Sequence, residues 1–218
     1  MQESVNTLQL SGVVKLARKI ILGTALIEGT GAVLLSIRFV PRFGLVKGIY
    51  YGIFHSISAF CNAGFDLLGC DTPYMSLTGY SADWLVNLVI MSLIVIGGLG
   101  FIVWDDLSRK GLHFKSYMLH TKIVLLTTLA LIFGGALLIG ISERDNLMAD
   151  MGWGERILTS LFASVTARTA GFNTIDIASM RPASKLLTIF LMYIGGSPGS
   201  TAGGVKTTTL IVLLLYLG

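Results

Sequence analysis

The sequence predicts an all-α integral membrane protein built from tandem helix, re-entrant loop, helix repeats, with the last helix broken by a loop inside the membrane. The chain is 53% hydrophobic and only 13% charged, whereas about a quarter of the residues of a soluble domain are charged. One short phrase occurs twice, as AGFD at residues 63–66 and as AGFN at residues 170–173, 107 residues apart. Glycine, proline and hydroxyl residues interrupt the final apolar run, at residues 195–209.

Four apolar segments predict membrane spans. Residues 84–104 carry no charge over 21 positions and residues 123–141 none over 19, close to the roughly 20 residues that a spanning helix needs. Residues 20–37 are equally apolar except for Glu28, and residues 186–217 are apolar at both ends. We expect Glu28 to pair with a basic group or to lie near an interface. The chain is therefore predicted to be a multi-pass protein of the cell membrane.

The charge distribution predicts the side that each link faces. Basic residues precede the first span and fill the link at residues 105–122, while acidic residues dominate the opposite side. By the positive-inside rule, residues 1–19 form a cytoplasmic lead-in and the 105–122 link is also cytoplasmic. Arg38, Arg42 and Lys47 depart from the rule, because they fall on the predicted outer side.

The repeated phrase divides the remaining chain into two units, residues 20–110 and residues 111–218. Each unit has a span, a short helix, a loop and a closing span, and an Ile-Gly-Gly phrase occurs in both closing spans. The short helices, at 49–60 and about 155–167, cannot cross an apolar core of about 30 Å at about 1.5 Å per residue. Each must enter and leave by the same face, and we expect both to enter from outside.

Each short helix directs the negative end of its dipole toward the loop that follows. Gly64 and Gly171 permit backbone angles that other residues avoid. Asp66 and Asn173 follow them, and we expect these two residues to adopt positive φ, which their side chains tolerate well. Backbone carbonyls at membrane depth are tolerated where they line a water-filled path. The two loops therefore predict a carbonyl-lined ion filter.

The predicted filter has two matched sets of backbone groups, with Arg168 beside the second. We expect Arg168 to point away from the ion path and to hold its loop by hydrogen bonds. The acids Asp66, Asp71 and Asp83 either raise the local cation concentration or belong to a solvated loop. The predicted filter residues are Cys61, Asn62, Ala63, Gly64, Phe65, Thr169, Ala170, Gly171 and Phe172.

The last span cannot be one straight helix. A continuous helix over residues 186–218 would run about 50 Å, well past the apolar core. Its centre, residues 195–209, holds five glycines, Pro198 and six hydroxyl residues, which disfavour a helix. We expect a flexible gating loop there, in which Lys206 either marks a functional site or extends to the cytoplasmic surface. The gating residues are Gly195, Gly196, Ser197, Pro198, Gly199, Ser200, Thr201, Ala202, Gly203, Gly204 and Lys206.

Other classes of function find little support in the sequence. A nucleotide-binding loop needs glycine directly before its lysine, but Val205 separates Gly204 from Lys206. The residues that enzymes use as nucleophiles, bases or metal ligands form no recognisable arrangement, so we expect neither an enzyme nor an organic cofactor. The net charge of +4 follows from membrane orientation, so we expect no nucleic-acid partner.

Three phrases resemble the Ktr/Trk/HKT superfamily of potassium transporters, and most of all its ion-translocating KtrB-type subunit. They are FHSISAFCNAGFD at 54–66, SVTARTAGFNT at 164–174 and IGGSPGSTAGGVKTTT at 194–209. The stretch from Thr169 to Asn173 is also similar to the TVGYG filter of potassium channels, with the final glycine replaced. Together the repeats cover nearly the whole chain.

The resemblance implies a pore of four such units in one polypeptide, each giving one filter glycine, with Gly64 and Gly171 as two of the four. The third unit of the family carries an intramembrane gating loop, which matches residues 195–209. This chain would then be a fragment that holds the second and third units and lacks the first and fourth. The resemblance also implies transport of K⁺, an involvement of Na⁺, a homodimer, and a cytoplasmic ring of nucleotide-sensing RCK subunits.

Two other classes remain open from the residues alone. An ion-coupled solute symporter would place a midplane substrate site at the broken helix. Such carriers often use inverted repeats, whereas the two units here run in the same direction. The third class is an inactive scaffold, which would show no flux and no ion at Gly64 or Gly171.

Overall fold

The computed structural model describes residues 2–70, 75–111 and 113–217, and within these residues its regular elements are helical. An isolated β-bridge, between Ile194 and Val205, is the exception in this part of the chain. The predicted fold class, all-α with a broken last helix, is therefore confirmed.

The first unit consists of α1 (Gln2–Phe43), α2 (Leu45–Phe60), α3 (Trp84–Leu99) and α4 (Phe101–Lys110). Helix α1 runs through the predicted lead-in without a break, so residue 19 marks no structural boundary. The predicted short helix is confirmed as α2, which begins four residues earlier than expected.

The second unit consists of α5 (Leu119–Glu143), α6 (Trp153–Ala167), α7 (Pro182–Tyr193) and α8 (Thr207–Leu217). The predicted span and short helix are confirmed as α5 and α6. Short 3₁₀ turns lie in the links at Leu68–Cys70, Thr78–Tyr80, Phe114–Ser116 and Ile177–Ser179.

Two predicted boundaries are wrong. The segment 84–104 is not one straight span, because α3 and α4 meet at Gly100 with a bend of 96°. Gly100 has φ 85°, a backbone angle that ends a helix and that glycine adopts readily. The gating loop is also shorter than predicted, since residues 207–209 belong to α8 and the loop covers residues 194–206.

Among the residues described, two helices are long and apolar enough to cross a membrane, Val14–Phe43 and α5, and the bent pair α3 and α4 passes the same test together. Many large apolar side chains on these helices face outward, as expected where lipid is the solvent.

The outer arginines that depart from the positive-inside rule have local partners. Arg38 Nε lies 3.2 Å from Asp83 Oδ2. The Arg42 guanidinium lies 5.2 Å from the centre of the Tyr80 ring, within the range of a cation–π contact. These contacts account for two of the three exceptions; Lys47 forms no ion pair among the residues described.

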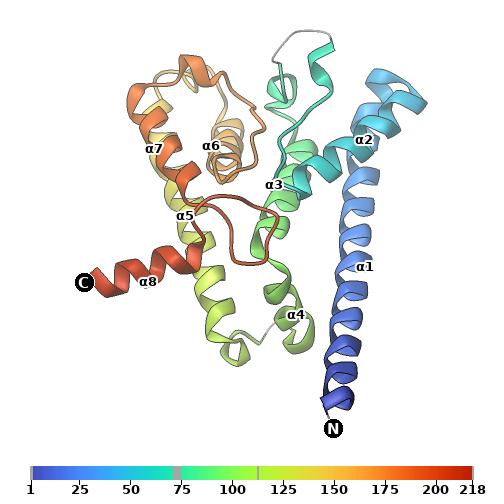
Figure 1. The fold of residues 1–218 in the computed structure, drawn as a ribbon. Helices are drawn as coiled ribbons and strands as arrows, with labels where there is room; N and C mark the ends of the chain where they lie inside the picture. Colours follow the sequence, from blue (N-terminus) through green and yellow to red (C-terminus); the bar gives the residue numbers. More distant parts are fainter. Residues whose placement is uncertain (1, 71–74, 112, 218) are drawn as a thin grey trace.

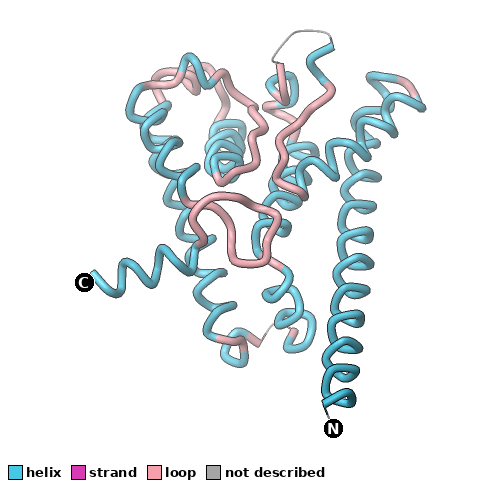
Figure 2. The backbone as a smooth tube through the Cα atoms, viewed as in Figure 1, coloured by secondary structure: helices cyan, strands magenta, loops and turns pink. Residues whose placement is uncertain are grey.

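Helices α1, α3, α5 and α7 run roughly along one axis, and α2 and α6 lie toward the end opposite the N-terminus (Figure 1). The loops that follow α2 and α6 meet between the two units, and the 194–206 loop crosses the centre beneath them (Figure 2). Both short helices therefore direct their C-terminal ends toward the same central region.

Each short helix is held to the long helix of its unit by one serine. Ser56 donates to Glu28 O at 2.7 Å in the first unit, and Ser164 donates to Ile132 O at 2.8 Å in the second. The long helix has a glycine at each contact, Gly31 or Gly135, where an added Cβ would overlap the serine hydroxyl. The repeat in sequence is therefore also a repeat in packing.

Candidate functional site

The loops after α2 and α6 have the same backbone conformation at matched positions. Asn62 and Thr169 have φ 53° and 72°, and Gly64 and Gly171 have φ 70° and 91°. Each loop thus has two left-handed residues, two positions apart. Asn is among the residue types that tolerate positive φ, which is a signal for Asn62; nothing in the sequence indicates Thr169.

The expectation that Asp66 and Asn173 adopt positive φ is wrong. Both residues lie past the turn and bond to the segment that follows the first loop. Asp66 Oδ1 accepts from Leu68 N at 3.1 Å, and Asn173 N donates to Ser76 Oγ at 3.1 Å. The reversal of chain direction occurs earlier, at the last turn of each short helix.

Gly64 and Gly171 bring the two loops into backbone contact. A Cβ added at Gly64 would overlap Ala170 O and lie 2.8 Å from Gly171 Cα. A Cβ at Gly171 would lie 3.3 Å from Gly64 Cα. The structure therefore brings together the two central residues of the predicted filter, and the space between them admits no side chain.

A hydroxyl near the end of each short helix fixes the carbonyl that follows the filter glycine. Ser58 donates to Phe65 O at 2.7 Å, and Thr166 donates to Phe172 O at 2.6 Å. His55 is buried in the first unit, with Nδ1 2.7 Å from Tyr51 O. These hydroxyls were not among the predicted site residues, although their position at the helix end before each AGF phrase is a usable signal.

The two loops differ in burial. Phe172 is 0% exposed, and its ring centre lies 6.3 Å from that of His55 in the first unit. Phe65, its counterpart, is 69% exposed, and Cys61 and Ala63 are exposed as well. The second loop is therefore packed against the first unit, while the first loop leaves one side open.

The gating loop closes on itself at its base. Gly195 N donates to Val205 O and Val205 N donates to Tyr193 O, both at 3.0 Å. Lys206 Nζ donates to Ala202 O at 2.7 Å. Lys206 thus folds back onto its own loop.

The gating loop docks on the broken end of α3. Ser197 N donates to Gly98 O at 3.0 Å, and Thr201 N donates to Gly97 O at 3.2 Å. In return, Phe101 N donates to Gly199 O at 3.1 Å. The last carbonyls of α3 have no partner in their own helix, so the bend at Gly100 makes them available to the loop.

The docking glycines were missed as site residues by the sequence analysis. A Cβ at Gly97 would overlap Phe60 O, and one at Gly100 would lie 2.5 Å from Ser197 Oγ. The signal that could have found them is the Ile-Gly-Gly phrase, which occurs at the end of α3 and again where α7 gives way to the gating loop.

Side chains also connect the gating loop to both filter loops. Thr201 Oγ1 donates to Phe60 O at 2.9 Å and accepts from Asn62 Nδ2 at 2.9 Å. Arg168 is buried, and its Nη2 donates to Gly195 O at 3.4 Å. Arg168 therefore bonds to the gating loop and not, as expected, to its own filter loop.

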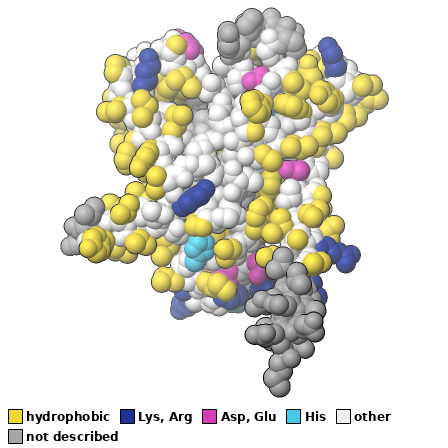
Figure 3. Space-filling model, viewed as in Figure 1, with side chains coloured by type: hydrophobic (Ala, Val, Ile, Leu, Met, Phe, Trp, Pro, Cys, Tyr) yellow, Lys and Arg dark blue, Asp and Glu magenta, His cyan; other side chains and the backbone are white. Residues whose placement is uncertain are grey.

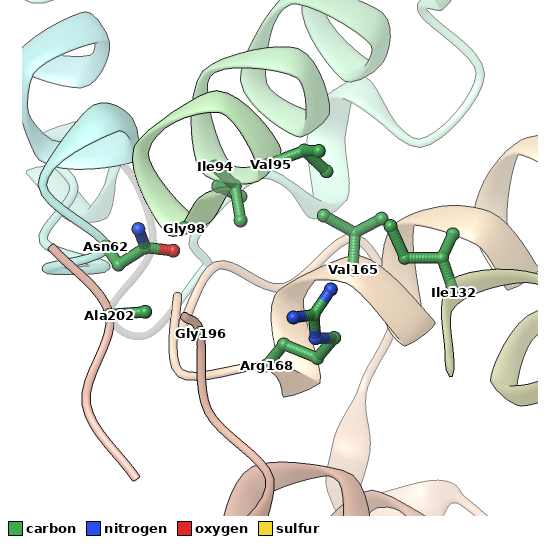
Figure 4. A pocket seen from close by; sticks show the side chains of 9 residues that line it. All are labelled: Asn62, Ile94, Val95, Gly98, Ile132, Val165, Arg168, Gly196 and Ala202. Atoms are coloured by element: carbon green, nitrogen blue, oxygen red, sulfur yellow. The ribbon is translucent and has the colours of Figure 1, made fainter. Parts of the chain in front are cut away.

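A small cavity of about 10 Å³ lies between the filter loops and the gating loop, room for about one water molecule. Asn62 and Arg168 are among the nine residues that line it (Figure 4). Asn62 Oδ1, Arg168 Nε and Thr169 Oγ1 are buried beside the filter without a hydrogen-bond partner. Buried polar atoms of this kind are costly unless water reaches them, and here they lie beside a cavity whose lining is mainly apolar.

Acidic side chains do not form a separate ion site in the described residues. No group of three or more His, Cys, Asp or Glu side chains is arranged there to hold a metal ion. Asp83 caps α3 by accepting from Leu85 N at 3.0 Å and pairs with Arg38, so its role is structural. Asp71 lies outside the described residues.

Comparison with known proteins gives the family. A family model described as "TrkH: Cation transport protein" matches residues 2–217. The potassium/sodium uptake protein NtpJ of Enterococcus hirae is 46% identical over 218 residues, which are 100% of this chain and 47% of that protein. The Ktr system potassium uptake protein B of Bacillus subtilis is 41% identical over 216 residues, 98% of this chain and 47% of that protein.

A solved structure has the same fold. The crystal structure of the potassium transporter TrkH from Vibrio parahaemolyticus matches with a TM-score of 0.64 and 24% identity, covering 84% of this chain and 38% of that one. The chain spans about half the length of the curated relatives it matches. The matched residues include both predicted filter loops and the predicted gating loop, and the chain belongs to the TrkH family of cation transport proteins.

Proposed function

We propose that this chain forms half of a potassium-conducting pore, with the backbone carbonyls around residues 61–65 and 168–172 replacing water around the ion. The observation that carries this proposal is the contact between Gly64 and Gly171, in matched left-handed conformations, at the meeting point of two helix C-terminal ends. Carbonyl oxygens held this way are the ligands of a potassium filter. The names of the two relatives, a potassium/sodium uptake protein and a potassium uptake protein, support K⁺ as the ion.

The asymmetry of the two phenylalanines supports a ring of units in a longer polypeptide. Phe172 of the second unit is buried beside His55 of the first, whereas the matching Phe65 is 69% exposed. A contact between unlike faces repeats around a ring until the ring closes. We therefore propose that the units at 20–110 and 111–218 are the second and third of four.

The gating loop is proposed to control passage. It lies beneath both filter loops and is bonded to each of them, through Thr201 and Arg168. The face on which it lies is mostly backbone and small or polar side chains down its middle, with hydrophobic side chains over the flanks (Figure 3). Such a face is suited to water and ions, and the flanks to lipid or neighbouring units.

Orientation and partners follow from the same proposal. The filter loops face outward, and the N-terminus and the 105–122 link are cytoplasmic, in line with the charge asymmetry. The assembled transporter is proposed to be a homodimer on a cytoplasmic RCK ring, with Na⁺ taking part in transport or activation. No organic cofactor or enzymatic step is proposed.

The test is rescue of K⁺ uptake in cells that require added potassium. The four-unit polypeptide that contains this chain is compared with its Gly171→Ser variant and with the 218-residue chain alone. We expect rescue by the four-unit protein, weaker uptake or reduced K⁺ over Na⁺ selectivity in Gly171→Ser, and no rescue by the short chain. Unchanged uptake and selectivity in Gly171→Ser would reject the carbonyl filter and favour the symporter.

A further inference from the structure

Helices α5 and α6 enclose a groove of about 410 Å³ that the proposed pore does not use. Its lining is mainly apolar, and several of the side chains face outward. The apolar lining includes Phe133, Leu137, Ile141, Trp153, Ile157 and Leu161. We call it the α5–α6 groove.

The groove has a basic rim at its outer end. Arg144 and Arg156 both line it there, beside the exposed Trp153. Arg156 is fixed, because Nε donates to Met151 O at 2.8 Å and Nη2 donates to Ala149 O at 2.7 Å. This leaves part of a rigid guanidinium fork for another acceptor, and such forks suit phosphate.

Acidic residues near the rim do not neutralise these arginines. The ion pairs found in the described residues include neither of the two. Glu143 accepts from Arg181 N at 2.9 Å, and Glu155 accepts from the Ser81 hydroxyl at 3.2 Å. Two cations thus lie at an apolar groove without a carboxylate partner.

The length of the groove fits one lipid leaflet. From Phe133 to Arg144 the groove follows α5 for about 16 Å, at about 1.5 Å per residue. This is about half of an apolar core of about 30 Å. Trp153 lies at the same end as the arginines, and tryptophan is enriched at the boundary between headgroups and acyl chains.

The first unit indicates that neighbouring units leave this groove open. The two units can be matched at the serine bonds that hold α2 to α1 and α6 to α5. In this alignment Leu137 and Ile141 of α5 correspond to Val33 and Ile37 of α1. Val33 is 66% exposed and Ile37 57%, although the second unit follows the first in the structure. The α5–α6 groove is likewise uncovered by the unit that precedes it, so in the proposed ring neither neighbour would fill it.

The same alignment shows that the basic rim belongs to the second unit alone. Arg144 and Arg156 align with Val40 and Gly48 of the first unit. The two matching positions of the first unit therefore carry no charge. This contrast provides an internal control for any lipid that binds by charge.

We propose that the α5–α6 groove binds an acidic phospholipid of the leaflet on the filter side, with one acyl chain along α5 and its phosphate at Arg144 and Arg156. The apolar lining excludes water from the chain, and the arginines select a phospholipid with net negative charge. That the groove stays uncovered in the longer protein rests on the proposed ring of units. The basic rim does not depend on which ion is transported.

The first test uses the intact transporter, reconstituted with equal amounts of phosphatidylglycerol and phosphatidylcholine and analysed by native mass spectrometry. We expect retained phosphatidylglycerol, and about tenfold less of it in Arg144→Glu, the size of a lost charge-assisted contact. Arg18→Glu, a matched change of an exposed arginine on α1 that does not line the groove, should retain it. Equal loss in both variants, or no preference between the lipids, would overturn the proposal.

The second test identifies the occupant directly. A photo-reactive benzophenone amino acid at Leu137, which is 64% exposed, is activated in membranes, and the mass of its adduct is measured. A phospholipid adduct supports the proposal, and an adduct to polypeptide overturns it by showing that protein covers the groove. Because neither readout measures uptake, a failure here is distinct from a failure of the Gly171→Ser test.

Discussion

The two units are nearly the same around their filter loops and differ most where their closing helices end. Both have a serine that holds the short helix, a hydroxyl that fixes the loop, and a left-handed glycine at its centre. Helix α3 is interrupted by a single residue, Gly100, before α4 continues. Helix α7 is followed instead by the whole 194–206 loop before α8.

Because of this difference, the two units contribute different parts of one contact. The first unit provides free carbonyls at the broken end of α3, and the second provides the loop that occupies them. A straight α3 would satisfy those carbonyls internally and leave the gating loop without its dock. The geometry of the proposed filter loops is thus common to both units, whereas the docking of the 194–206 loop needs both of them.

The largest expected effect comes from replacing the two glycines of the proposed filter, and it compares how tightly each is packed. Gly64→Ala places a methyl group against Ala170 O, whereas Gly171→Ala meets Gly64 Cα at 3.3 Å. Both variants lose about 1–2 kcal/mol to the left-handed backbone, and overpacking at Gly64 adds about 1–3 kcal/mol. We expect Gly64→Ala to abolish K⁺ uptake and lower Tm further than Gly171→Ala. Equal losses in Tm would mean that the loops do not touch as described.

The next effect concerns the dock at the broken helix. Gly100→Ala would bring a Cβ within 2.5 Å of Ser197 Oγ and 2.8 Å of Pro198 O, whereas Gly111→Ala meets nothing within 4 Å. Both glycines combine positive φ with extended ψ, 85° and 149° at Gly100 and 59° and −143° at Gly111, so both variants lose about 1–3 kcal/mol of backbone energy. Only Gly100→Ala should displace the gating loop, measured as faster proteolysis or altered gating of uptake. Similar behaviour of the two variants would argue against the dock.

A smaller effect is expected at the contact between gate and filter. Thr201→Val removes the hydroxyl shared by Phe60 O and Asn62 Nδ2, both at 2.9 Å, while Thr201→Ser keeps it. Loss of one such bond is worth about 1–2 kcal/mol, or about a tenfold shift toward an open loop. We expect higher K⁺ flux without activation in Thr201→Val and near-normal flux in Thr201→Ser. Lower flux in Thr201→Val would indicate that the bond supports the filter rather than the closed gate.

The sequence predicted the repeat because glycine-rich phrases and apolar lengths are local features. Gly64 and Gly171 could be placed for that reason, and so could the interruption after α7. The bend at Gly100 could not be predicted, since residues 84–104 have the composition of a continuous apolar helix. The bend is accompanied by hydrogen bonds from the 194–206 loop to the end of α3, and that loop is distant in sequence. The partner of Arg168 was missed for the same reason, because Gly195 is 27 residues away in sequence.

The residues with positive φ could not be predicted from residue type alone. Asp66 and Asn173 were favoured because their side chains tolerate left-handed backbone, yet the turn is made two residues before each glycine. Thr169, a β-branched residue, adopts φ 72° because its loop is packed on the first unit, with Ala170 and Phe172 buried on either side of Gly171. Tertiary packing sets that angle, and intrinsic preference does not.

The smallest expected effect lies in the outer link of the second unit, where Asp176 caps a short 3₁₀ turn, whereas Asp83 of the first unit caps α3 directly. The Ser179 hydroxyl, followed by the Ala178 N–H, holds the pKa of Asp176 below its ordinary value. A carboxylate with a lowered pKa stabilises the fold above its ordinary pKa of about 4 and loses that contribution as the pH falls. We therefore expect Asp176→Asn to lower Tm slightly at pH 7 and to match the unsubstituted protein in acid. Ser179→Ala should reproduce part of this pH dependence with the carboxylate in place; a Tm difference that is constant with pH would assign the effect to the geometry of the cap and not to its charge.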